Sequence, residues 1–225
     1  MKRSDLPTPA LVIEADAFER NLRSMAAQFP GAALRPHVKA HKCTSLAAKQ
    51  VEVGHRSFTC ATPHEVVGMA EAGIGDDLLL ANESIDPIRL ARMAAVQHLT
   101  MVTIAVDSPA TVDAAARAGL RQVIVDVNVG LPRCGALPED AGRIADLARA
   151  AGMEVRGVMG YEGHLMMVDD RGEQAQRVAD AMGRLIAAHE LVGGDIVSAG
   201  GTGTAHLHHV CLLYTSPSPR DVEES

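Results

Sequence analysis

The stretch from Met101 to Ala118 reads MVTIAVDSPATVDAAARA, which is a strand pattern followed at once by a helix pattern. Residues 101–106 are apolar except for one threonine, as is typical of a strand buried on both faces. Ser108 and Pro109 come next and indicate a helix start, because serine caps free N–H groups and proline fits the first turn. Alanine and valine then recur at helical spacing. The stretch therefore predicts one βα unit.

The same succession of a short apolar run and an amphipathic run recurs along most of the chain. The predicted strands are Leu34–Val38, Ser57–Ala61, Asp77–Leu80, Met101–Val106, Gln122–Val127, Val155–Gly160 and Asp195–Ala199. The helices predicted between them include Thr62–Ala72, Asp86–Gln97, Ser108–Ala118 and Leu137–Ala151. Repeated βα units build a parallel sheet covered on both faces. About seven such strands predict an α/β fold, an incomplete (β/α)8 barrel of TIM type. No GxGxxG fingerprint supports the doubly wound alternative.

Both ends of the chain depart from this pattern. The chain begins with the run Leu11–Glu14 and a predicted long helix from about Asp16 to Gln28. This part could belong to a second structural unit. Residues 211–225, CLLYTSPSPRDVEES, have no periodicity and look like a translated sequencing adapter. A natural Ser/Pro-rich tail is the alternative. We therefore expect residues 1–210 to be a truncated barrel domain and residues 211–225 to be non-native.

Composition excludes several classes of protein. The chain has 225 residues, 47% hydrophobic residues and a net charge of −7. This acidic balance argues against a nucleic-acid partner, and the apolar runs are too short to span a membrane. The N-terminus has no apolar signal segment, so we expect a cytoplasmic protein. The four cysteines are scattered without a CxxC pair and predict neither disulfides nor a zinc site.

The stretch RPHVKAHK, from Arg35 to Lys42, contains two of the four lysines of the chain. Arginine is plentiful elsewhere, so solubility gives little reason for lysine here. A lysine amine gives up its proton when it is desolvated or crowded by cations, and it can then form a Schiff base. Lys39 is therefore the candidate nucleophile, and a solvated basic loop is the alternative.

Polar groups follow four of the predicted strands. They are Lys39 after the first strand, Asn128–Gly135 after the fifth, Tyr161–His164 after the sixth and Ser198–Thr204 after the seventh. Catalytic groups of barrels lie at the C-terminal ends of the strands, so all four groups are predicted to share one rim.

The segment GGTGT, residues 200–204, is a candidate anion site. Its glycines let the backbone approach a ligand, so the N–H groups of Gly201 and Gly203 and the hydroxyls of Thr202 and Thr204 could cradle an anion. A tight turn is the alternative. A lysine and an anion turn on one rim together suggest a phosphorylated aldehyde, pyridoxal 5′-phosphate (PLP).

Four further residues are candidates by type and position. Arg133 would be a fixed cation beside the cofactor ring. Tyr161 and His164 suit stacking, orientation or proton transfer, since histidine is the commonest general base. His37 would form a hydrogen bond beside Lys39. A purely structural role is the alternative for each. His206, His208 and His209 are interpreted as loop residues, so no metal ligand is assigned.

Four motifs together resemble one known family. They are PHVKAHK at 36–42, VNVG at 127–130 with RCG at 133–135, GYEGH at 160–164, and GGTGT at 200–204. The set resembles the D-threonine aldolase family, which includes D-serine dehydratases and 3-hydroxy-D-aspartate aldolases and dehydratases. These proteins share the fold type III PLP architecture of alanine racemase.

The resemblance implies that Lys39 carries PLP, that Gly203 and Thr204 help to bind its phosphate, and that Arg133 and Tyr161 flank its ring. Lys39 or His164 would be the base at Cα. It also implies a C-terminal β-domain, missing here, with a divalent metal (manganese, magnesium or zinc) on a histidine and an aspartate or cysteine. A homodimer is expected for the full-length protein.

The expected function is a PLP-dependent lyase acting on a D-configured β-hydroxy-α-amino acid as its small-molecule substrate. Retro-aldol cleavage to glycine and an aldehyde, and dehydration of D-serine or 3-hydroxy-D-aspartate, both remain open. The alternatives are a non-catalytic PLP-binding homeostasis protein and an amino-acid racemase. We expect the 225-residue chain itself to be inactive.

Overall fold

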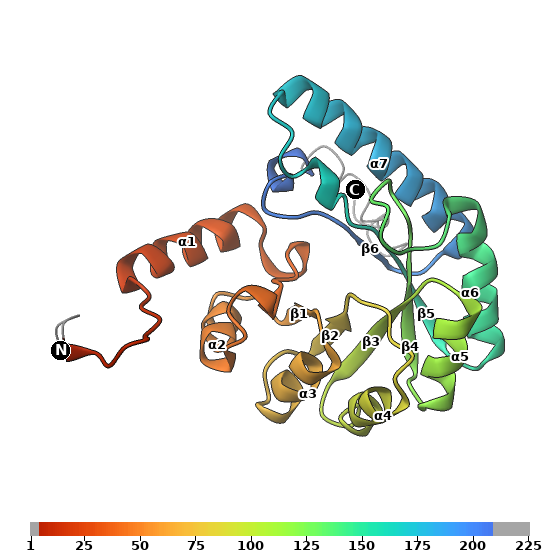
Figure 1. Cartoon of the computed structure of the whole chain (residues 1–225), viewed down its shortest axis with the longest axis horizontal. Helices are drawn as coiled ribbons and strands as arrows, with labels where there is room; N and C mark the ends of the chain where they lie inside the picture. Colours follow the sequence, from red (N-terminus) through yellow and green to blue (C-terminus); the bar gives the residue numbers. More distant parts are fainter. Residues whose placement is uncertain (1–4, 209–225) are drawn as a thin grey trace, which may run out of the picture.

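Six parallel strands form one sheet in the order β1-β2-β3-β4-β5-β6, which is also their order along the chain. The computed structural model describes residues 5–208. The strands are β1 (Ser57–Cys60), β2 (Asp77–Leu80), β3 (Met101–Val106), β4 (Gln122–Asp126), β5 (Glu154–Met159) and β6 (Ile196–Ser198). The sheet curls from β1 to β6 into part of a barrel (Figure 1). The predicted incomplete α/β barrel is confirmed.

A helix lies in each connection between neighbouring strands. These helices are α3 (Pro63–Glu71), α4 (Pro87–Ala95), α5 (Pro109–Arg117), α6 (Ala141–Ala150) and α7 (Arg171–Val192). All five surround the outer, convex side of the curl (Figure 1). The concave side and the C-terminal ends of the strands are therefore free for other groups.

Three of these helices begin where the sequence predicts a cap. The Thr62 side chain accepts a hydrogen bond from the Glu65 N–H, and the Asp86 carboxylate accepts from two N–H groups. Ser108 and Thr111 form a reciprocal capping box at the start of α5. Each cap is followed by proline in the first turn, so the helices begin at Pro63, Pro87 and Pro109.

Alternate strand residues pack on opposite faces of the sheet. Leu79, Ala105 and Ile124 form a buried cluster with Met159 on the concave face. Their strand neighbours, such as Leu78, belong to the larger core between sheet and helices. Asp126 is two residues beyond Ile124 and so shares the concave face, at the C-terminal end of β4.

The predicted strand Leu34–Val38 is wrong. Only His37 pairs with the sheet, in an isolated parallel bridge to Thr59, and the Thr59 N–H donates to the Pro36 carbonyl (2.9 Å). Pro36 has no N–H to donate, and a 3-10 turn begins at Val38 and takes the chain off the sheet. The other six predicted strands are confirmed, two of them with identical ends and the rest with ends that differ by one residue.

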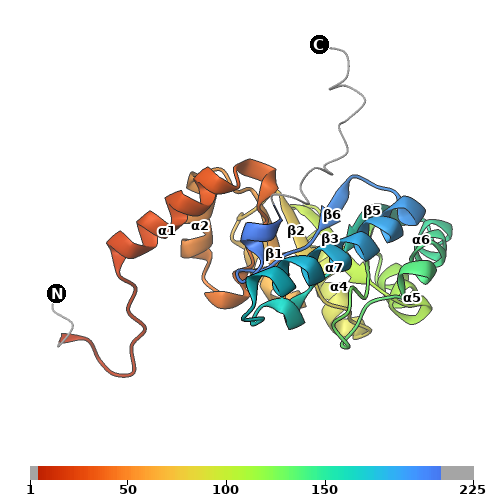
Figure 2. The same ribbon diagram turned by 90° about the horizontal axis from the view of Figure 1, so that it is seen from above.

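The N-terminal part of the described chain extends away from the barrel. Helix α1 (Ala15–Gln28) and the segment before it form an arm, while α2 (Thr44–Glu52) lies next to β1 (Figures 1 and 2). Leu11–Glu14 forms no strand, and Leu11 is 91% exposed. The predicted non-native tail, residues 211–225, lies outside the described residues.

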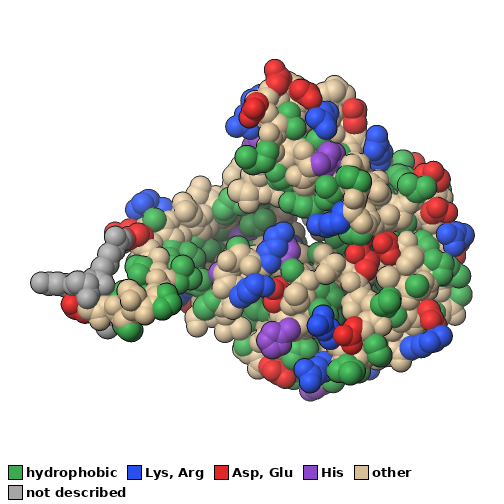
Figure 3. All heavy atoms as spheres, viewed as in Figure 1, with side chains coloured by type: hydrophobic (Ala, Val, Ile, Leu, Met, Phe, Trp, Pro, Cys, Tyr) green, Lys and Arg blue, Asp and Glu red, His purple; other side chains and the backbone are tan. Residues whose placement is uncertain are grey.

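Charges of both signs are mixed on the face of the molecule seen in Figure 3. On the face in Figure 3, acidic and basic side chains are interspersed rather than gathered into one large patch. Within residues 5–208, no helix is long and apolar enough to cross a membrane.

Candidate active site

The candidate site is centred on the ring of Tyr161, just beyond the end of β5, where Lys39 and Arg133 meet. The Lys39 Nζ lies 5.5 Å from the ring centroid, and the Arg133 Cζ lies 5.6 Å from the same centroid. Both distances are within the range of cation–π attraction. Lys39, Arg133 and Tyr161 are 28 or more residues apart in sequence, yet the shared rim brings them to one ring.

Lys39 lies in the 3-10 turn Val38–Ala40 and is exposed. His37 caps this turn, because its Nδ1 accepts a hydrogen bond from the Lys39 backbone N–H (3.3 Å). Burial, and then the neighbouring Lys39 ammonium, lowers the pKa of His37 to about 4. His37 is therefore neutral near pH 7, as its role of acceptor requires.

The other two described lysines are engaged elsewhere. Lys42 pairs with Glu65, and Lys49 pairs with Glu52 at 2.8 Å. Of the lysines in residues 5–208, Lys39 alone forms no ion pair. Its amine is thus the one available to a ligand beside Tyr161.

The loop after β4 folds back so that Arg133 faces Tyr161. The Asn128 N–H donates to the Ala136 carbonyl (2.8 Å), and the Ala136 N–H donates to the Asp126 carbonyl (2.9 Å). Gly135 makes this closure possible: its φ is +98°, and a Cβ there would lie 2.6 Å from the Asn128 N. The closed loop therefore needs glycine at this position.

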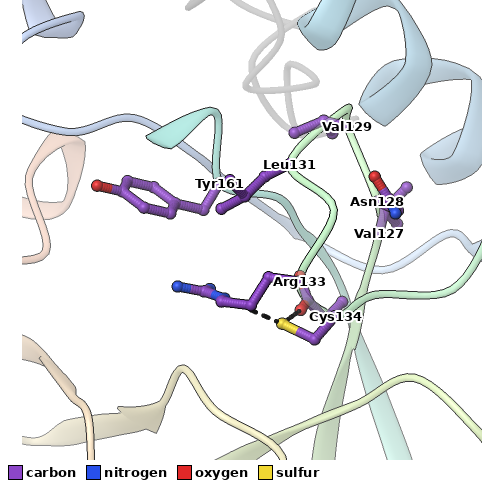
Figure 4. A pocket seen from close by; sticks show the side chains of 8 residues that line it. Val127, Asn128, Val129, Leu131, Arg133, Cys134 and Tyr161 are labelled. Carbon is purple, nitrogen blue, oxygen red and sulfur yellow. Dashed lines mark hydrogen bonds between the residues drawn. The ribbon is translucent and has the colours of Figure 1, made fainter. Parts of the chain in front are cut away.

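A narrow pocket lies between this loop and Tyr161. Its lining residues are Asp126, Val127, Asn128, Val129, Leu131, Arg133, Cys134 and Tyr161. In Figure 4 the Arg133 and Tyr161 side chains extend toward the same side of the loop. Cys134 lies behind Arg133, whose Nε–H donates to the thiol sulfur at 3.4 Å.

The glycine segment after β6 packs against the same ring. A Cβ at Gly201 would lie 3.2 Å from Tyr161 Cε2 and 2.7 Å from Met166 Cε, so the Gly201 backbone lies close to the Tyr161 ring. The Thr204 hydroxyl donates to Glu162 Oε1 (2.6 Å), and the Thr204 N–H donates to the Gly201 carbonyl (3.0 Å). Among the hydrogen bonds of residues 5–208, none uses the N–H of Thr202 or Gly203.

Glu162 organises this segment, a role that sequence reasoning missed. Its side chain is fully buried and accepts from the Gly200 N–H (3.2 Å), the Thr204 hydroxyl and the His208 Nε2 (2.7 Å). Burial works to raise the pKa of Glu162, but the hydrogen bonds from His208 and Thr204 bring it below its ordinary value. Its adjacency to Tyr161 in the GYEGH motif was the available signal.

His164, in the same GYEGH motif as Tyr161 and Glu162, lies next to Gly130. A Cβ at Gly130 would lie 3.2 Å from the His164 Nε2 and 3.4 Å from an Arg184 nitrogen, so the imidazole faces Gly130 and Arg184. Burial, and then Arg177, lowers the pKa of His164. The imidazole is neutral near pH 7 and can accept a proton.

Two residues of the pocket wall, Asp126 and Cys134, meet Glu83, which is not itself a lining residue. One carboxyl oxygen of Glu83, one of Asp126 and the Cys134 sulfur lie within 4.8 Å of one another, and Asp126 is 4% exposed. Burial, and then the adjoining Glu83 carboxyl, raises the pKa of Asp126 to about 8. Sequence reasoning missed both carboxyls, although each follows or ends a strand on the rim side.

Comparison with known proteins shows which family the chain resembles. Residues 13–216 match the model of the alanine racemase N-terminal domain. The chain is 32% identical to D-threonine aldolase of Arthrobacter sp over 225 positions, which cover 92% of this chain and 58% of that protein. It is 30% identical to D-threo-3-hydroxyaspartate dehydratase of Delftia sp. (strain HT23), over 89% of this chain and 56% of that protein.

A solved structure of a similar protein has the same fold over the matched part. The crystal structure of D-threonine aldolase from Filomicrobium marinum superposes with a TM-score of 0.84 and 31% identity, over 92% of this chain and 60% of that chain. The chain thus spans less than two thirds of the length of these relatives.

Proposed function

Because the chain belongs to the alanine racemase N-terminal domain family, we propose that it is the barrel part of a PLP-dependent lyase acting on D-configured β-hydroxy-α-amino acids. One observation carries the proposal: the Lys39 amine and the Arg133 guanidinium both contact the Tyr161 ring. The names of the similar aldolase and dehydratase favour a lyase over a racemase or a cofactor-homeostasis protein.

The described residues fit PLP. An amine without an ion-pair partner, an aromatic ring and a cation meet on one side of the pocket. The glycine segment touches the same ring and leaves the N–H groups of Thr202 and Gly203 unused, as binding of a phosphate would require. When bound, PLP supplies an electron sink for bond breaking at Cα.

Each residue then has a defined task. Lys39 holds the cofactor through its amine, and neutral His37 keeps the turn around Lys39 in place. Tyr161 would pack against the cofactor ring, and Arg133, whose Cζ lies 5.6 Å from the centre of the Tyr161 ring, would place its charge near it. The N–H groups of Thr202 and Gly203 would bind the phosphate, and Gly201, whose N–H donates to the Thr204 hydroxyl (3.3 Å), would hold the turn close to it. The Thr204 hydroxyl donates to Glu162 and its N–H donates to the Gly201 carbonyl, so Thr204 holds the turn in shape, and its own contact with the phosphate stays a prediction.

Proton transfer at Cα requires a base. Lys39 and His164 are the candidates, and the lowered pKa of His164 leaves its ring free to take a proton near neutral pH. Aldol cleavage and dehydration both remain within the proposal. We retain as proposals a divalent metal (manganese, magnesium or zinc) held outside the described residues, a homodimer and a cytoplasmic location for the full-length protein.

Lysine trapping tests the cofactor half of the proposal. The chain is incubated with PLP, reduced with borohydride and mapped by peptide mass spectrometry. The label is expected on Lys39 and not on Lys42 or Lys49, whose amines are paired with carboxylates. A label spread over all three lysines, or confined to Lys42 or Lys49, contradicts the assignment.

Product analysis of the full-length protein tests the reaction. With manganese or magnesium present, D-threonine should give glycine and acetaldehyde if the enzyme is an aldolase. D-serine or 3-hydroxy-D-aspartate should release ammonia if it is a dehydratase. L-threonine is the matched control and should give neither product. Racemisation of alanine without either product would support the racemase alternative instead.

A further inference from the structure

Glu83 and Asp126 come from different βα units and meet beside Cys134. Glu83 lies in the connection between β2 and α4, and Asp126 ends β4. One carboxyl oxygen of each residue and the Cys134 sulfur lie within 4.8 Å of one another. Asp126 and Cys134 line the pocket with Arg133 and Tyr161, and Glu83 meets them from outside the lining.

If both carboxyl groups were ionised, neither could donate a hydrogen bond to the other. The Glu83 Oε1 is buried and has no hydrogen-bond donor among residues 5–208. Buried polar atoms are almost always satisfied, and one proton held between the two carboxyls would satisfy this oxygen. Like charges this close also favour retention of one proton by the pair.

A short chain of hydrogen bonds connects the pair to Arg133. The Cys134 thiol donates to Asp126 Oδ2 at 3.4 Å and accepts from the Arg133 Nε–H at 3.4 Å. Burial raises the pKa of Cys134 to about 11, so the thiol keeps the hydrogen that this bond needs. The position of Arg133 thus depends on Asp126 through one sulfur atom.

We propose that Glu83 and Asp126 share one proton and that this pair, through the Cys134 thiol, positions Arg133 and balances its charge beside the bound cofactor. With one proton held, the pair and Arg133 together carry no net charge. When that proton leaves, the pocket wall gains a negative charge next to the place where an anionic ligand binds. Glu83 and Asp126 are positioning residues.

The other charged groups around the pair are few. Asp107, between β3 and α5, accepts from the Gly135 N–H (3.2 Å) and the Thr111 hydroxyl (3.3 Å), and its charge also favours retention of the proton. From the loop after β4, Cys134 contacts Asp126, and Arg133 contacts Cys134. Arg133 is the one cation near Asp126 that the described contacts reveal.

Carboxyl NMR tests the shared proton without any cofactor. In the full chain labelled with carbon-13 at Asp and Glu carboxyls, one carboxyl signal should stay protonated above pH 6 and titrate near pH 8. Asp126→Asn should abolish this transition, and Glu83→Gln should move it to lower pH. Asp146→Asn, at an exposed position, is the control and should leave it unchanged. If every carboxyl titrates below pH 6, the proposal is overturned.

The link to Arg133 has its own readout. The nitrogen-15 resonance of the Arg133 Nε–H should follow the same transition, because that group donates to the thiol next to Asp126. In Asp126→Asn and in Cys134→Ala it should no longer titrate. An Arg133 resonance that ignores the transition in the unmodified chain overturns the positioning role, even if the proton is shared.

A final arm rests on the proposed function and uses PLP itself. Between pH 6.5 and 9.5 the affinity of the unmodified chain for PLP should fall on the order of tenfold more than that of Asp126→Asn, since one extra charge acts at short range. Parallel profiles for the two chains would contradict the charge-balance role. Absence of PLP binding at any pH would count against the proposed function, while the two NMR arms would still decide the inference.

Discussion

Arg156 of β5 donates to both carboxylate oxygens of Asp77 of β2, at 2.8 and 2.9 Å, although β3 and β4 separate these strands in the sheet. Arg156 also donates to the Thr103 hydroxyl of β3 (2.7 Å), and Arg35 donates to Asp77 from the other side (2.7 Å). Asp77 is the first residue of β2, and Thr103 and Arg156 lie in the first halves of β3 and β5. These groups therefore form a polar layer across the barrel at the end opposite the candidate site.

Loss of Asp77 should destabilise the protein without altering the site. Asp77→Ala leaves two mostly buried guanidinium groups without their shared partner, and we expect the free energy of unfolding to fall by about 3 kcal/mol. Asp76→Ala is the matched control, because its pair with Arg56 is exposed on both sides and should matter little. Urea unfolding at pH 7 measures both. Equal losses in the two variants would contradict the polar layer.

Acid should destabilise the fold through His37. Its pKa is about 4 when folded and 6.5 when free, so the unfolded chain binds more protons between these values. Stability should therefore fall as the pH decreases from 6.5 to 4. In His37→Asn, whose side-chain oxygen can still accept from the Lys39 N–H, this part of the slope should disappear. Melting temperatures measured in steps between pH 4 and 7 provide the test, and identical slopes would exclude the effect.

Removal of the Glu162 carboxylate should loosen the glycine segment. Glu162→Ala leaves three buried or half-buried donors without an acceptor, and we expect a loss of about 2–4 kcal/mol in stability. Glu162→Gln keeps the shape and one acceptor oxygen, so its loss should be smaller. Affinity for inorganic phosphate should fall in the same order. A phosphate affinity that is unchanged in Glu162→Ala would show that the anion turn does not need this carboxylate.

A side chain at Gly135 should displace Arg133. Gly135→Ala combines a positive φ with a collision against the Asn128 backbone. Gly119→Ala is the control, since its φ is +78° but no atom lies within 4 Å of the added carbon. Both should lose about 1–2 kcal/mol from backbone strain, with a larger loss for Gly135→Ala. Only Gly135→Ala should weaken PLP binding, as measured by absorbance. Equal PLP affinities would show that the loop closure does not position Arg133.

The repeated βα units were predictable because their signals are local. Apolar runs, caps and prolines fall within a few residues of one another, as around Ser108, and each unit carries its own copy of the pattern. The failure at Leu34–Val38 is also local in origin. Pro36 removes a donor and the 3-10 turn follows, so an apolar run that reads as a strand pairs through only one residue.

Contacts between side chains on opposite sides of the barrel could not be predicted from the sequence. Arg156 and Asp77 are separated by 79 residues, and Glu83 meets Asp126 only because of the strand register and the direction of each side chain. The convergence of Lys39, Arg133 and Tyr161 follows from a rule about strand ends. No comparable rule predicts which carboxyls share a proton or that Cys134 lies between two charged groups.

The adjacency of Tyr161 and Glu162 has a mechanical consequence. One residue offers its ring to Lys39 and Arg133, and the next holds Gly200, Thr204 and His208 through its carboxylate. If the glycine segment binds an anion as proposed, a single peptide unit would set the distance between that anion and the Lys39 amine. Ligands whose reactive carbon and negative group are separated by this one length would then fit best.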